Sequence, residues 1–221
     1  MTASFLLDAP HLILHVHLQQ RGFRVTDSSG SVAFYQEQWD EGSVHGPQLT
    51  IHGISVGIRT GMGGDAAPGG VTDTALVPLA KVSWLRPLSS VITVYNVRAR
   101  RRLHMNREVP FSSRHTVAGP STMWHWKRRR RRPWATSQLR LVDRRAARML
   151  ATLVYHKSFK HRYRAGHLAT LKIGASAPPE CIDEIVVTAL AKLTYQRIHL
   201  YYTMHGTKPT VAQIAGVAKP R

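Results

Sequence analysis

The 221-residue chain has one cysteine, few acidic residues and no long uncharged apolar run. A single thiol cannot form an intramolecular disulfide or a zinc site built from several cysteines, so nothing here argues for secretion. The uncharged run from Ile185 to Ala191 is far shorter than the roughly 20 apolar residues that a membrane-spanning helix needs. The sequence therefore predicts neither a disulfide scaffold nor a transmembrane helix.

The N-terminal segment, residues 1–23, also lacks the features of a secretory signal. It has an acid at Asp8 and histidines where a signal peptide needs a basic start and an unbroken apolar run. We therefore expect an intracellular protein, either cytoplasmic or peripheral to a membrane, with the nucleus as an alternative compartment.

The scarcity of acidic residues leaves a formal charge of +19, from 31 Lys and Arg against 12 Asp and Glu. The excess is local: residues 98–177 hold 21 basic and two acidic residues, residues 1–97 hold five and seven, and residues 178–221 hold five and three. A field of this kind attracts polyanions, which are either anionic membrane lipids or nucleic acid.

One long segment, residues 180–202, has the pattern of a helix. Pro178 and Pro179 can stand just before a helix, and Asp183 and Glu184 lie where the helix dipole favours negative charge. Apolar residues recur at spacings of three and four and extend round to the opposite side, so the predicted helix needs to be enclosed on nearly all sides.

Most of the chain before Pro178 reads as short strands separated by turns. The turn Asp27–Gly30 predicts a hairpin, and the segment 48–59 changes phase around Gly53 as a β-bulge requires. These segments predict a mainly β domain over residues 1–204, with a mobile tail at 205–221. An antiparallel sandwich or barrel fits this order, and we expect a closed antiparallel barrel of about 10–12 strands around a buried C-terminal helix.

Six segments from Val82 onward carry a resemblance to a known family. They are KVSWL at 81–85, the strand ending in Trp126 and Lys127, LRLVD at 139–143, the alternating strand 149–155, LATLKI at 168–173 and DEIVVTAL at 183–190. Their order resembles a family of uncharacterised domains of mushroom-forming fungi with a tubby-like fold, similar to phospholipid scramblases and plant LURP-one-related proteins. The resemblance implies a closed barrel around a central C-terminal helix, with membrane association or phosphoinositide binding by analogy of fold. It carries over no catalytic residue, and Arg128–Arg132 and the insertion at 61–70 depart from its pattern.

The arginine run is the main candidate site for binding anions. Adjacent guanidinium groups can bind the phosphates of lipid headgroups or of nucleic acid, and a nearby indole favours the membrane interface. The predicted anion-binding residues are Lys127, Arg128, Arg129, Arg130, Arg131, Arg132, Arg100, Arg101 and Arg102, with Trp134 as an interface aromatic residue. The alternatives are a solvated loop, with Trp124 and Trp126 facing the core, or a nuclear import signal.

Other chemistry-bearing residues favour structural roles. His15 and His17 can place two imidazoles on one face of a strand, but no third ligand accompanies them at a persuasive spacing, so we predict no metal site. Cys181 reads as a structural thiol, because burial opposes any activation by the helix dipole. The glycine-rich segment 60–74 lacks the helix and the lysine of a phosphate-binding loop.

No catalytic motif is present, so the sequence predicts a non-enzymatic domain without a cofactor. We expect it to interact with anionic membrane lipids. Nucleic-acid binding through the arginine run, or a scaffold for another partner, is the alternative.

Overall fold

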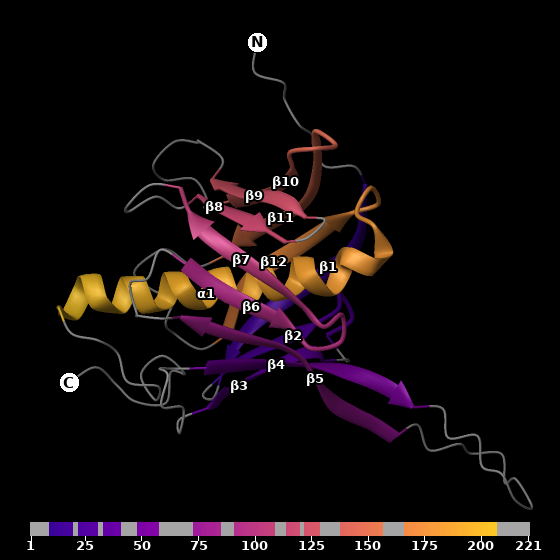
Figure 1. The fold of residues 1–221 in the computed structure, drawn as a ribbon. Helices are drawn as coiled ribbons and strands as arrows, with labels where there is room; N and C mark the ends of the chain where they lie inside the picture. The colour runs from indigo at the N-terminus through magenta and orange to yellow at the C-terminus, as the bar shows by residue number, and fades with distance from the viewer. Residues whose placement is uncertain are drawn as a thin grey trace, which may run out of the picture.

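A computed structural model describes residues 9–19, 22–30, 33–40, 48–57, 73–84, 91–108, 114–119, 122–128, 138–156 and 166–206. The predicted loop at 60–74, apart from residues 73 and 74, and the predicted tail beyond residue 206 lie outside these ranges, as do Arg129–Arg132 and Trp134. Within them the chain forms strands followed by one long helix (Figure 1). The mainly β, antiparallel class with a single C-terminal helix is confirmed.

The described residues form twelve strands. They are β1 (Pro10–Gln19), β2 (Gly22–Thr26), β3 (Ala33–Asp40), β4 (Gln48–Gly57), β5 (Asp73–Trp84), β6 (Val91–Asn96), β7 (Arg101–Arg107), β8 (His115–Ala118), β9 (Met123–Arg128), β10 (Gln138–Asp143), β11 (Arg148–Tyr155) and β12 (Gly166–Gly174). Each strand pairs antiparallel with the next, and β1 also pairs with β12, so the ladder returns to its start as a closed barrel.

Alternation along the strands separates an inner from an outer face. On β1, Leu14, Val16 and Leu18 are buried while His15 and His17 between them face outward and are partly exposed. A register shift between β4 and β5 lies between Ile51 and His52, but its extra residue is Leu79 of β5, so the bulge is not on the segment around Gly53 where it was predicted. Alternation of this kind fixes which residues fill the barrel and which face solvent.

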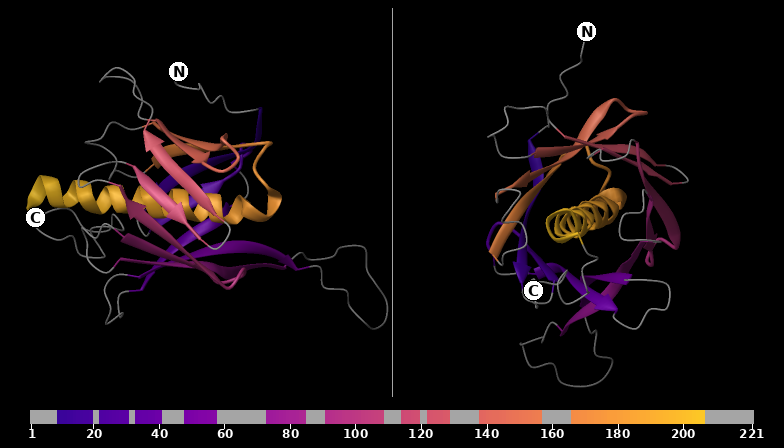
Figure 2. Two further views of the ribbon diagram at one scale, coloured as in Figure 1. Left: turned by 45° about the horizontal axis from the view of Figure 1, so that its top comes forward. Right: turned by 90° about the vertical axis from the view of Figure 1, so that its left-hand side faces the viewer.

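The helix α1 (Ile182–His205) follows a short 3-10 helix, η2 (Pro179–Cys181), and lies inside the ring of strands (Figure 2). It starts two residues later than predicted because Pro179–Cys181 forms the tighter turn. Side chains on all sides of it are buried, including Val186, Leu190 and Ile198. The enclosed helix expected from its apolar pattern is therefore confirmed.

Polar contacts fix the start of the helix against the wall. Arg101 of β7 forms an ion pair with Glu184, which is 1% exposed, and the Tyr35 hydroxyl of β3 donates a hydrogen bond to Asp183 Oδ1 at 3.0 Å. Burial, followed by the Asp183 charge and hydrogen bond, raises the pKa of the Tyr35 hydroxyl far above its usual value. These two acids, predicted to serve the helix dipole, thus also join α1 to two different strands of the barrel, β3 and β7.

The two ends of the barrel can be named by the helix. At the entry end, where α1 begins, lie the turns 27–30, 97–100 and 144–147. At the exit end, where α1 finishes, strands β9 and β11 end. Successive connections alternate between the ends because every strand reverses the chain direction. This alternation decides which basic segments can meet.

Candidate anion-binding surface

The turn between β6 and β7 projects arginines at the entry end. The Asn96 side-chain oxygen accepts a hydrogen bond from the Ala99 backbone N–H at 2.9 Å, which stabilises the turn. The Arg98 side chain is 82% exposed and lies 3.7 Å from Asp183, while Arg100 and Arg102 are exposed. Arg100 has φ 50°, a left-handed conformation that usually selects glycine or asparagine.

The turn between β10 and β11 repeats this design. Asp143 Oδ1 accepts hydrogen bonds from the backbone N–H groups of Arg145 at 2.9 Å and Ala146 at 3.2 Å, and Ala147 has φ 49°. Arg144 and Arg145 are both exposed on it. Two turns of the same geometry therefore present arginines at the same end of the barrel.

The predicted arginine run begins at the other end. Lys127 and Arg128 are the last residues of β9, and both are exposed. Trp124 and Trp126 on the same strand are buried, as the alternative of core-facing indoles predicted, and Trp126 Nε1 donates to Thr188 Oγ1 of the helix at 3.4 Å. The rest of the run follows in sequence outside the described residues.

The two basic clusters that the structure describes in part lie at different ends of the barrel. Arg100–Arg102 lies at the entry end and Lys127–Arg128 at the exit end, because connections three strands apart emerge on opposite ends. Both clusters belong to the same part of the wall, because β7 and β9 both pair with β8. Arg102 and Lys127 are both exposed, and Arg140 of β10 pairs in register with Lys127.

Arg101 differs from the other predicted anion-binding residues. Its side chain points into the barrel, where Nε donates to Glu184 Oε1, and is 29% exposed. The guanidinium is therefore used in the ion pair with Glu184 that holds the start of α1 against the wall. Arg101 is better described as a structural residue than as part of the outer surface.

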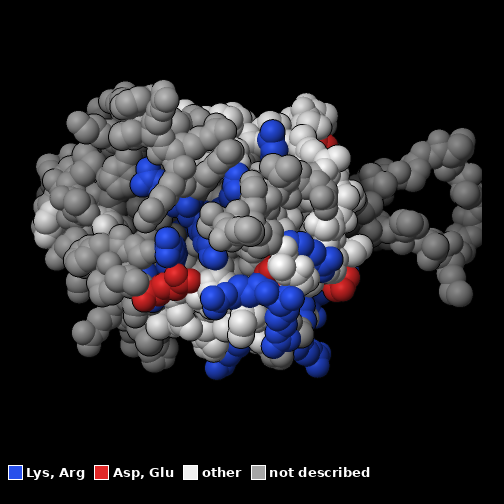
Figure 3. All heavy atoms as spheres, turned by 90° about the horizontal axis from the view of Figure 1, so that it is seen from above, with Lys and Arg blue, Asp and Glu red and all other residues white. Residues whose placement is uncertain are grey.

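The two halves of the wall differ sharply in charge. The described residues from β1 to β5 carry two basic side chains, Arg24 and Lys81, and four acids, Asp27, Glu37, Asp40 and Asp73. Those from β6 to β12 carry 13 basic residues and two acids, Glu108 and Asp143. We call this second half the basic wall; Figure 3 shows Lys and Arg side chains gathered on its upper face, with few acids among them.

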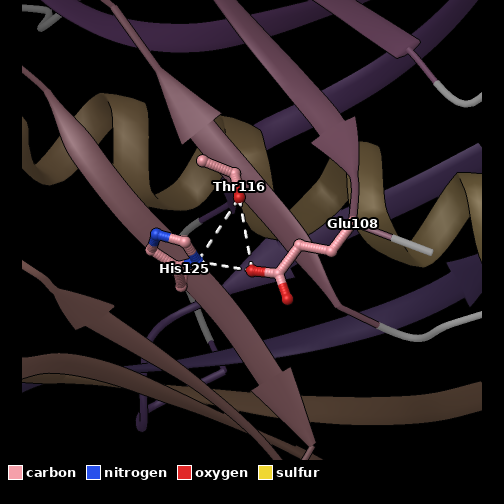
Figure 4. Close-up of polar contacts among 3 residues, drawn as sticks. All are labelled: Glu108, Thr116 and His125. Carbon is pink, nitrogen blue, oxygen red and sulfur yellow. Dashed lines mark hydrogen bonds and ion pairs between the residues drawn. The ribbon is translucent and has the colours of Figure 1, made fainter.

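A contact on the basic wall that sequence reasoning missed joins Glu108, Thr116 and His125 (Figure 4). His125 Nδ1 lies 2.7 Å from Glu108 Oε1 and 3.3 Å from the Thr116 hydroxyl. Burial raises the pKa of Glu108, but the hydrogen bond and charge of His125 outweigh it and hold that pKa below its usual value. Carboxylate and hydroxyl contact the same ring nitrogen, so the imidazole cannot pass a proton between them as a catalytic relay does.

Basic groups also extend inside the barrel. Arg107 Nη2 donates to the Tyr195 hydroxyl, and its guanidinium carbon lies 5.2 Å from the ring centroid. Lys192, which is 1% exposed, is hydrogen-bonded to His115 Nδ1. Burial and the charge of Arg107 lower the pKa of Lys192 well below its usual value. With so little of Lys192 exposed, this cluster contributes to the electrostatics of the core and offers no open binding site.

The remaining candidates keep structural roles. Cys181 is partly buried, and burial together with the charges of Glu184 and Glu180 raises the pKa of its thiol, which opposes nucleophilic activation. His15 and His17 share the outer face as predicted. In the part of the chain that the structure describes, no group of three or more His, Cys, Asp or Glu side chains is arranged to hold a metal ion.

Comparison with protein-family models, with curated proteins and with solved structures found no match. Of the helical segments in the described ranges, none combines the length and apolar character needed to cross a bilayer.

Proposed function

We propose that this protein is a non-catalytic domain that binds anionic phospholipid membranes peripherally through the basic wall. The observation that carries the proposal is the division of charge between the two halves of one barrel, with 13 basic residues and two acids on one half against two and four on the other. Such a division orients the molecule in the field of a negative surface.

The architecture supports the proposal independently of charge. A closed barrel around a buried C-terminal helix is what the resemblance to tubby-like fungal domains implies, and we propose that the chain is a domain of that kind. The membrane association implied for scramblase-like and tubby-like proteins then agrees with the charge distribution.

The expected energetics follow from exposed arginines acting together. Each basic residue close to an anionic leaflet contributes about 1 kcal/mol, and the attraction decays over about 8 Å at physiological ionic strength. Arg100, Arg102, Arg144 and Arg145 are all exposed, so they can approach headgroups without breaking a core contact. Binding is therefore salt-sensitive and requires several of them.

The first test is cosedimentation with vesicles of phosphatidylcholine alone or mixed with phosphatidylserine, over a series of salt concentrations. Changing Arg100, Arg102, Arg144 and Arg145 together to Gln is expected to weaken binding to the anionic vesicles by two orders of magnitude or more, at about 1 kcal/mol for each residue. Thermal stability changes little, because exposed charges contribute little to folding. Unchanged vesicle binding by this variant would remove the entry-end turns from the mechanism.

A matched pair separates location from total charge. Arg145→Gln and Lys81→Gln each remove one exposed cation, the first from the basic wall and the second from β5 on the other half. We expect Arg145→Gln to weaken binding several-fold and Lys81→Gln to leave it nearly unchanged. Equal losses would mean that net charge alone, and no oriented surface, drives the association.

The arginine run is tested in the same assay. Changing Arg128–Arg132 to Gln is expected to weaken vesicle binding steeply with little loss of stability. RNA of matched charge is the comparison ligand: tighter binding to RNA than to anionic vesicles at equal salt would favour nucleic acid as the partner.

A further inference from the structure

Four histidines meet on the outer face of the barrel near the exit end, where β1, β11 and β12 adjoin. His167 of β12 lies at the centre: its ring centroid is 5.1 Å from that of His15, 5.0 Å from that of His17 and 4.3 Å from that of His156. Only His15 and His17 are neighbours in sequence. We call these four residues the histidine cluster.

Three ring nitrogens of the cluster converge on one hydroxyl. Thr170 Oγ1 lies 2.7 Å from His156 Nε2, 3.3 Å from His15 Nδ1 and 3.3 Å from His167 Nε2. His15 Nδ1 and His167 Nε2 are themselves 3.4 Å apart, and His167 Nε2 also lies 3.1 Å from the Ala169 carbonyl oxygen. When the imidazoles are protonated, every ring nitrogen becomes an N–H donor, and the cluster then holds more donors than these oxygens can accept.

The charged groups that act on the cluster are all basic. Arg24 of β2 pairs in register with His17, and its charge acts on that imidazole, while the charge of Lys172 of β12 acts on His156. Burial first, and then the charge of neighbouring histidines, lowers the pKa of His17, His156 and His167. No carboxylate of the described residues is among the groups that act on these three imidazoles. Protonation therefore concentrates positive charge at a place where no carboxylate of the described residues compensates it, and an added anion can do so.

We propose that the histidine cluster, with Lys172 and Arg24 beside it, binds a phosphate monoester group when its imidazoles take up protons. A phosphate offers three acceptor oxygens to the converging N–H donors and neutralises their mutual repulsion. The phosphate comes either from free solute or from a lipid headgroup, and only the second source rests on the proposed membrane function.

Binding and proton uptake are linked in this site. An anion that prefers the protonated cluster raises the affinity of the imidazoles for protons, and by reciprocity acidification raises the affinity for the anion. With at least one proton taken up per anion bound, affinity increases about tenfold or more between about pH 7.5 and about pH 5.5. Sulfate is a useful second probe, because its own charge does not change over this range.

The direct test follows each histidine ring by NMR during a pH titration, with a chelator present, in chloride and then in phosphate or sulfate at equal ionic strength. The titration midpoints of His167 and His156 are expected to move to higher pH in the oxyanion, while that of His104, which is exposed on β7 outside the cluster, stays in place. Equal movement of His104, or no movement at any of them, would overturn the proposal.

Two variants separate the cluster from general charge. His167→Gln removes the central ring and is expected to abolish the oxyanion-dependent shift of His156, whereas His104→Gln, the matched control, leaves that shift intact. A preserved shift in His167→Gln would show that the cluster does not act as one site. His167 is on the outer face, so we expect His167→Gln to fold. A thermal melt of each variant checks that both are folded.

The lipid source is tested with vesicles containing phosphatidic acid, whose headgroup is a phosphate monoester, or phosphatidylserine at matched surface charge. Binding of the parent protein at about pH 5.5 is expected to favour phosphatidic acid, and His167→Gln is expected to lose that preference. A shift with free phosphate but no lipid preference assigns the site to a solute. If the protein binds no vesicles at all, the proposed membrane function is contradicted, while the proposal that the histidine cluster binds a phosphate group from solution is not affected.

Discussion

The two halves of the barrel wall both have a mainly apolar inner surface, but they differ in charge. Both β1–β5 and β6–β12 place apolar side chains inward, such as Leu49 and Ile51 on one half and Leu103 and Met105 on the other. Over the described residues, the first half carries slightly more acidic than basic residues, and the second half is strongly basic. Packing around the helix constrains the inner face, whereas the outer face is free to vary, so the difference between the halves points to what the molecule meets in solution.

The asymmetry continues into the core. The basic half contributes Arg101, Arg107 and His115 to contacts with the helix, whereas the other half contributes the Tyr35 hydroxyl and the ring of Phe23, which lies 5.1 Å from the guanidinium carbon of Arg197. At the entry end the cations have acidic partners, Asp183 and Glu184. Farther along the helix, Lys192 sits beside Arg107, so like charges are close together.

The largest expected effect comes from placing a charge in the apolar interior that both halves of the wall enclose. Leu190→Asp places an unpaired charge at a position that is 2% exposed, which costs at least several kcal/mol and is comparable to the whole stability of a domain. We expect no cooperative unfolding transition in this variant by circular dichroism. Val77→Asp, at a position on β5 that is 42% exposed, is the control and should fold normally. A soluble, cooperatively folding Leu190→Asp protein would contradict the enclosed helix.

An intermediate effect is expected at Lys192, where the basic half reaches the core. Its folded-state pKa is lowered, so the unfolded chain binds more protons and stability rises as pH rises toward the unfolded pKa. Lys192→Met keeps the volume and removes this cost, so at neutral pH it should stabilise the protein by about 1–4 kcal/mol. The gain should shrink in alkaline solution, and urea denaturation at several pH values measures it. A gain that does not depend on pH would mean that Lys192 keeps its proton in the core.

Local sequence patterns predicted the helix and most of the strands, because each depends on periodicity within a short segment. They did not identify β7 or β8 as strands. Arg101 and Arg107 occupy inward positions of β7, where their partners are Glu184 and the Tyr195 hydroxyl of a helix more than 80 positions away. An arginine at an inward position interrupts the apolar alternation that identifies a strand, and the sequence alone does not show the distant partner that makes the position possible.

The candidate sites show the same limit. His15 and His17 were found together because they are two residues apart, whereas His156 and His167 join them only through the pairing of β1 and β11 with β12. The contact between Glu108 and His125 likewise depends on register. The arginine clusters lie at different ends because successive connections of an antiparallel barrel emerge at alternate ends.

The smallest expected effect is a change in stability at two turns of the basic wall, and it separates the structural role of a turn residue from the role of its charge. Arg100 and Ala147 occupy equivalent positions in the two entry-end turns, with φ 50° and 49°. The left-handed conformation costs a residue with a Cβ about 1–2 kcal/mol, and glycine avoids this cost. Part of the gain is lost because glycine makes the unfolded chain more flexible, so that more conformational entropy is lost on folding. Arg100→Gly and Ala147→Gly should therefore each stabilise the protein by about 0.5–1 kcal/mol, seen as a higher urea midpoint at unchanged slope.

Vesicle binding then distinguishes the two variants. Arg100→Gly removes an exposed guanidinium and should weaken binding to anionic vesicles several-fold although the fold is more stable, whereas Ala147→Gly should bind as the parent does. If Ala147→Gly lowers the urea midpoint, the turn geometry is wrong. If both variants bind equally well, an arginine stands at a strained position for a reason other than the membrane surface.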